Sequence, residues 1–119
     1  SEESVVEKAL DDCFEHRKGG LPQDTAMELS RSLRLEQPEQ AHSLHHSVAQ
    51  LVWHVAESPN APSNLFLKKE VGNLFPEGFH DDLKQLLVEM VAKKAPKWKE
   101  RVQNGGGAPP GKKEKKNKK

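Results

Sequence analysis

Histidine is the residue type that most invites a chemical interpretation, because six histidines occur among 119 residues. His42 and His46 are four positions apart, which places both rings on one side of a helix. Two such histidines can share a metal ion, but a zinc site needs a third and a fourth ligand. The sequence has neither an HExxH motif nor a pair of cysteines. We therefore expect a solvated polar face without metal or other cofactor, and keep a copper or zinc site at His42 and His46 as an alternative.

Groups for catalysis do not assemble into a recognisable pattern. The sequence contains no glycine-rich phosphate loop and no nucleophile elbow. Asp81 and Asp82 are adjacent, so on a helix they point about 100° apart and suit the helix dipole better than paired acid–base chemistry. The single cysteine, Cys13, excludes an internal disulfide and lies on an apolar stripe, which predicts simple burial. We expect that the protein is not an enzyme.

Aromatic side chains are candidates for contact with a protein partner. Trp53 falls beside His42 and His46, off the apolar stripe of its helix, and forms an exposed anchor there unless a neighbouring helix covers it. Phe75 and Phe79 bracket a Pro-Glu-Gly turn, where a structural staple between two helices is the favoured interpretation. The candidate interaction residues are Trp53, His42, His46, Phe75, Phe79 and Trp98.

Lysine dominates the C-terminal segment. Residues 112–119 carry a net charge of +5, whereas the rest of the chain carries −4. An acidic body is not typical of a nucleic-acid-binding fold. Flexible lysines attract RNA, anionic lipid or acidic protein, but without interleaved arginine or aromatic residues such binding is weak and salt-sensitive. A polyanion binder is therefore a second alternative, with the candidate residues Lys112, Lys113, Lys115, Lys116, Lys118 and Lys119.

Amphipathic helices are the elements that must position these side chains. Apolar residues recur every three to four positions, while Ile and Tyr are absent and no strand-like alternation occurs. A loop is expected at 58–62, where two prolines occur close together. These patterns predict an all-α, compact bundle of about five to six helices. The expected helices cover 4–17, 24–35, 38–57, 63–74 and the residues from 79 onward.

The last helix is the one whose course is hardest to predict. Pro96 lacks a backbone donor, so we expect a kink or a break there, with Trp98 and Val102 on a final short helix. Lys93 and Lys94 then lie in the last turn before the break, where positive charge suits the helix dipole. The apolar pattern ends at about residue 103.

The two ends of the chain differ in what they predict. Ser4 and Glu7 have capping-box spacing at the start of the first helix. Residues 1–103 are expected to fold as one helical domain, and residues 104–119, rich in Gly, Pro and Lys, to form a disordered tail. No apolar run reaches the roughly 18 residues of a membrane span, and the acidic N-terminus is unlike a signal peptide. We expect a cytoplasmic protein, associated with endosomes or present in the nucleus.

A family resemblance is carried by residues 74–80, which read Leu-Phe-Pro-Glu-Gly-Phe-His and are followed by Leu83-Lys84 and Leu86-Leu87. This stretch resembles the N-terminal helical domain of the COMM-domain-containing protein family, closest to the branch numbered nine, and the likeness extends over residues 1–103. The C-terminal COMM domain does not follow, so the family's dimerisation through it is not carried over. The resemblance implies an adaptor or scaffold that binds other COMM-family proteins in endosomal trafficking and NF-κB regulation, without a small-molecule substrate.

Overall fold

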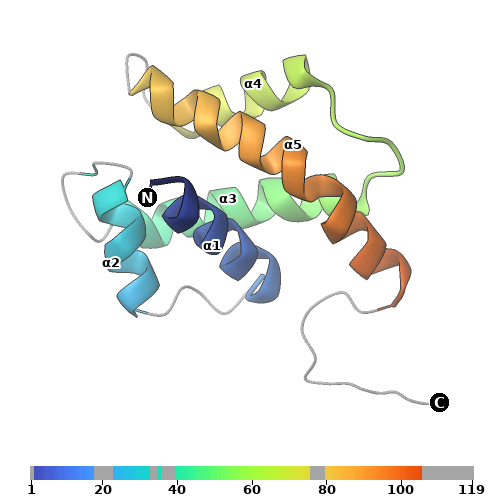
Figure 1. Cartoon of the computed structure of the whole chain (residues 1–119), viewed down its shortest axis with the longest axis horizontal. Coiled ribbons are helices and arrows are strands. Elements are labelled where there is room, and N and C mark those ends of the chain that lie inside the picture. Colours follow the sequence, from blue (N-terminus) through green and yellow to red (C-terminus); the bar gives the residue numbers. More distant parts are fainter. Residues whose placement is uncertain (1, 18–22, 33–34, 36–39, 76–79, 106–119) are drawn as a thin grey trace.

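The computed structural model describes residues 2–17, 23–32, 35, 40–75 and 80–105. All regular structure in these residues is helical, which confirms the predicted fold class. Figure 1 shows the arrangement. The helices are α1 (Glu2–Glu15), α2 (Gln23–Ser32), α3 (Gln40–Glu57), α4 (Asn64–Leu74) and α5 (Asp81–Gln103).

Helix α3 is the centre of the bundle and contacts each of the other four helices. Helices α1 and α2 pack together on α3, α4 packs against both α3 and α5, and α5 crosses α3 and packs against α1. The apolar stripes predicted from the sequence face this centre, and burial of their side chains is the main stabilising term of the fold. The largest fully buried side chains are Trp98, Phe14, Leu10, Leu67 and Leu83.

Helix α5 runs through Pro96 without interruption, so the prediction of a break and a separate final helix is wrong. Pro96 lies on the exposed side, whereas its neighbours Lys94, Ala95 and Trp98 are buried against the bundle. Burial of these flanking side chains outweighs the loss of one hydrogen bond on the solvent side. Tertiary packing therefore decides the length of this helix.

Lys94 makes two ionic contacts between α5 and α1. The sequence predicted other roles for Lys94 and Glu7. The ammonium of Lys94 lies 3.1 Å from the Glu7 carboxylate and 3.0 Å from that of Asp11. Lys94 is thus mid-helix and only 7% exposed, not a last-turn residue. The capping box is also wrong, because α1 begins at Glu2 and Glu7 instead accepts from Lys94.

Polar side chains form hydrogen bonds with the backbone at the C-terminal end of α3 and at the N-terminal end of α4. The ammonium of Lys99 donates to the backbone carbonyls of Val55 and Ser58 at the C-terminal end of α3. Ser63 caps α4 by accepting the Phe66 N–H at 3.0 Å. Such partners satisfy backbone groups that a helix leaves unbonded at its termini. They fix the loop between α3 and α4, which the sequence predicted at 58–62.

Some predictions fall outside the described residues. These are the staple contact of Phe79, the six lysines of residues 112–119 and the disorder of most of the 104–119 tail. The polyanion alternative and the domain boundary at residue 103 therefore stay predictions. Among the residues described, no helix combines the length and the apolar character needed to cross a membrane.

Candidate protein-interaction surface

Trp53 is buried, at 4% exposure, so its interpretation as an exposed anchor is wrong. Helix α1 covers this flank of α3. The Trp53 ring stacks on Phe14 with centroids 4.6 Å apart, and its indole N–H donates to the Phe14 carbonyl at 3.1 Å. Both the apolar ring and its polar edge are therefore satisfied within the domain.

The other described aromatic candidates are buried as well. Trp98 is 1% exposed and stacks on Phe14 at 6.1 Å between centroids, which joins α5 to α1. Phe75 is 7% exposed and follows the last residue of α4. Both residues therefore contribute to the core of the bundle.

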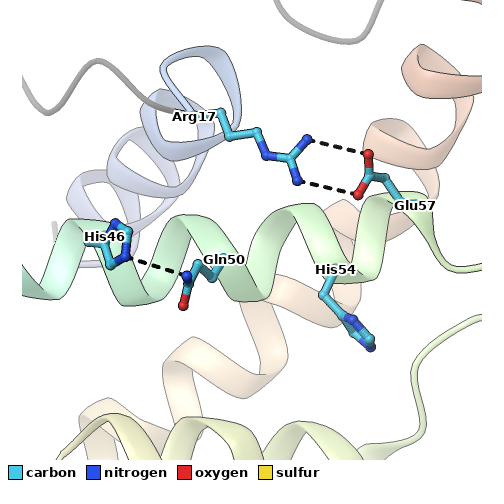
Figure 2. A pocket seen from close by; sticks show the side chains of 5 residues that line it. All are labelled: Arg17, His46, Gln50, His54 and Glu57. Atoms are coloured by element: carbon cyan, nitrogen blue, oxygen red, sulfur yellow. Dashed lines mark hydrogen bonds and ion pairs between the residues drawn. The ribbon is translucent and has the colours of Figure 1, made fainter.

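Arg17 is the residue that occupies the surface above Trp53. Its guanidinium carbon lies 4.6 Å from the Trp53 ring centroid, a cation–π geometry. The same group makes two contacts with the Glu57 carboxylate, at 3.3 and 3.5 Å, across α1 and α3 (Figure 2). Arginine suits this position because its planar fork both stacks and pairs.

The outer side of α3 carries a row of exposed polar side chains that we call the α3 ridge: His42, His46, Gln50 and His54. Their four-residue spacing places them along one face of the helix. The Gln50 amide donates to the His46 ring across 3.4 Å (Figure 2). Both histidines predicted to lie on a solvated face are therefore exposed.

Hollows flank the α3 ridge on two sides. The first, about 440 Å³, lies toward the end of α1 and is lined by Arg17, His46, Gln50, His54 and Glu57 (Figure 2). The second, about 400 Å³, lies toward α4 and is lined by Ser47, Gln50, Leu51, His54, Phe66, Glu70 and Leu74. Gln50 and His54 border both hollows, and the His54 ring stacks on Phe66 at 5.4 Å. The second hollow combines an apolar floor with a polar edge, as protein interfaces do.

Among the described residues, a metal site at His42 and His46 has no further ligand nearby. In the described ranges, no group of three or more His, Cys, Asp or Glu side chains lies in a position to hold an ion. The pair remains two exposed imidazoles on one helix.

A buried pair that the sequence interpretation missed is Cys13 and His45. The thiol sulfur lies 3.4 Å from His45 Nδ1 across the α1–α3 interface. His45 is four positions after the inward Ala41, and this spacing was the signal that could have found it. A cysteine beside a histidine can form a nucleophilic dyad. Here burial, with a smaller contribution from Asp12, raises the pKa of Cys13 to about 12, so the thiol is inert.

These features define a small all-helical domain with an exposed, hollowed surface along its central helix. The family follows from comparison with known proteins: residues 3–84 match the model of COMMD9, helical N-terminal domain, and the chain belongs to that family. The C-terminal COMM domain is not matched. Neither a curated protein nor a solved structure matches the chain.

Proposed function

We propose that this chain is a non-enzymatic adaptor or scaffold domain that binds other COMM-family proteins. The observation that carries the proposal is the family match over residues 3–84. Burial raises the pKa of the Cys13 thiol to about 12, which supports a structural role for this cysteine. By the same family relationship, the proposed setting is cytoplasmic assemblies that act in endosomal trafficking and in NF-κB regulation.

The proposed contact surface is the hollow between the α3 ridge and α4. Leu51, Phe66 and Leu74 form its apolar part, and Gln50 and Glu70 supply hydrogen-bonding groups. Its lining spans residues 47–54 of α3, which is about two helical turns or roughly 10 Å. A groove of this length and composition suits one amphipathic helix of a COMM-family partner, with apolar anchors three to four positions apart.

Affinity capture from cell extract, followed by identification of the bound COMM-family proteins, tests this proposal. In the variant Gln50→Arg, a longer charged side chain obstructs the hollow, and we expect at least about tenfold less COMM-family protein to be recovered. The matched control is Gln85→Arg on α5. Gln85 is likewise exposed and hydrogen-bonded within its own helix, to Glu89 at 3.0 Å.

The two parts of the proposal fail separately. If the unaltered chain recovers no COMM-family protein, the assigned function is wrong. If Gln50→Arg and Gln85→Arg both recover as much as the unaltered chain, the function stands and the assigned surface is wrong. Circular dichroism of each variant establishes that the helical fold is retained.

A further inference from the structure

We propose that His45 is an acid-sensitive latch between α1 and α3, and that α1 separates from α3 when the ring of His45 takes up a proton. The proposal concerns the regulation of the fold and is independent of the function assigned above. It rests on the burial of one ring, on its hydrogen-bond partners and on the charges that surround it.

The ring of His45 is placed so that its neutral form is favoured over its charged form. The residue is 4% exposed, and Nδ1 lies 3.4 Å from the Cys13 sulfur. The thiol of Cys13 keeps its proton and shares a hydrogen bond with Nδ1. Among the described residues, Nε2 is buried with no partner at hydrogen-bond distance, and the His16 backbone acts on the ring in the direction that favours its charged form. A proton added to the ring creates a buried cation.

The titratable groups around the ring oppose a positive charge. His16, directly after α1, and His42 and His46 on α3 each act on His45 electrostatically and lower its pKa. Four of the six histidines of the chain therefore gather at this side of the α1–α3 interface. On α1, the carboxylate closest in sequence to Cys13 is that of Asp12.

Helix α2 packs on both α1 and α3 and also carries charges. Asp24 and Arg31 are exposed, and Glu28 pairs with Lys8 at 3.5 Å. In the part of the chain that the structure describes, the polar partners of the His45 ring are the Cys13 thiol and the His16 backbone, and no carboxylate pairs with the ring. The protonated ring therefore lacks an anionic partner.

The direction of the pH effect follows from this environment. Burial lowers the pKa of His45 below its ordinary value of 6.5, and the neighbouring histidines add to the lowering against an opposing effect of the His16 backbone. The separated state, in which the ring is in water, takes up the proton first. The packed state, in which α1 lies against α3, therefore has its full stability above pH 6.5. It loses stability as the pH falls from 6.5 toward the lower pKa that His45 has in the packed state.

Hydrogen exchange of the full chain, corrected for the intrinsic effect of pH, tests the latch between pH 7.5 and 5.0. We expect the opening equilibrium of α1 to increase by up to about tenfold per pH unit below about 6.5. Helix α4 serves as the internal reference, because it packs on α3 and α5 and not on α1. The variant His45→Phe keeps a ring but cannot be protonated, and its α1 should open equally at both pH values.

The matched control is His54→Phe, which removes an exposed histidine from the same helix and should retain the response of the unaltered chain. Equal pH dependence in the unaltered chain and His45→Phe would overturn the proposal, as would an equal loss of protection in α1 and α4. Should His45→Phe fail to fold, an NMR titration of the unaltered chain decides. The latch requires the His45 ring to titrate below the ordinary histidine value of 6.5, and titration at or above that value contradicts it.

Discussion

The ring of Phe14 on α1 lies parallel to the ring of Trp53 on α3, with centroids 4.6 Å apart and planes inclined by 7°. Trp98 on α5 stacks on the same phenylalanine with planes inclined by 14°. One side chain of α1 therefore contacts an aromatic ring on each of the two longest helices. Phe14 is 1% exposed, so this arrangement forms the centre of the core.

Truncation of Phe14 should be among the most destabilising changes in the chain. We expect Phe14→Ala to lower the free energy of unfolding by about 3–5 kcal/mol, because it removes two stacked contacts and leaves a cavity. Urea denaturation followed by tryptophan fluorescence measures the change. Leu65→Ala, at a residue 79% exposed, should stay within about 0.5 kcal/mol of the unaltered chain. A loss below about 1 kcal/mol for Phe14→Ala would contradict the assigned packing.

Lys94 should stabilise the fold over a limited pH range. The hydrogen bond from Lys94 lowers the pKa of Glu7 below 4.5. Burial alone lowers the pKa of Lys94, but hydrogen bonds to Asp11 and Glu7 outweigh it and raise that pKa above 10.5. The stabilisation is thus present above pH 4.5 and lost as the pH falls through the lower Glu7 pKa, and it is present below pH 10.5 and lost as the pH rises through the higher Lys94 pKa.

The variant Lys94→Met removes this interaction, and Lys93→Met, at an exposed neighbour, is the control. The urea midpoint of Lys94→Met should fall most below that of the unaltered chain near neutral pH, with the difference shrinking toward both extremes. A constant difference from pH 3 to pH 11 would show that lost packing, not charge, is responsible.

Cys13 should react slowly with thiol reagents while the domain is folded. Its pKa is raised from 9.0 to about 12, so the thiolate fraction at pH 8 is about a thousandfold smaller than for an ordinary cysteine. Burial at 1% exposure adds a steric barrier. Labelling with iodoacetamide should therefore be at least about a hundredfold faster in denaturing urea. Similar rates in both conditions would mean that the thiol is not covered by the packing of α1 against α3.

Replacing Pro96 by alanine should stabilise the protein. The residue is exposed within α5, where alanine restores a backbone donor and has the highest helix propensity. We expect the free energy of unfolding to rise by about 1–3 kcal/mol in Pro96→Ala. Lys97→Ala, at the exposed next position, should change it by less than about 0.5 kcal/mol. Destabilisation by Pro96→Ala would indicate that the packing of α5 depends on the proline.

The helices were predictable from the sequence because their stability comes from apolar stripes that recur at a helical period. The spacing of Leu83, Leu87 and Val91 identifies α5, and the prolines at 59 and 62 identify the loop before α4. The continuation of α5 through Pro96 was not predictable, because it depends on which side of the helix faces the bundle. That orientation is set by partners far away in the sequence.

The site was predictable only where exposure follows from helical spacing. His42 and His46 were correctly placed on a solvated face, but Trp53 on the adjoining flank is covered by α1. The width of the buried face of α3 depends on how many helices pack against it. That number cannot be deduced from the sequence of α3 alone. The pairing of Cys13 with His45 likewise depends on the relative position of two helices.

The contacts of α1 with α5 have a consequence for the order of events during synthesis. Glu7 and Asp11 find their partner in Lys94, and Glu15 finds its partner in Arg101, each more than 80 residues later. Helix α1 is synthesised early and therefore lacks these partners until nearly the whole domain has been translated. Until then, Trp98 does not yet cover Phe14. During that interval the nascent chain exposes apolar surface, and it is then that binding by a chaperone has its greatest effect.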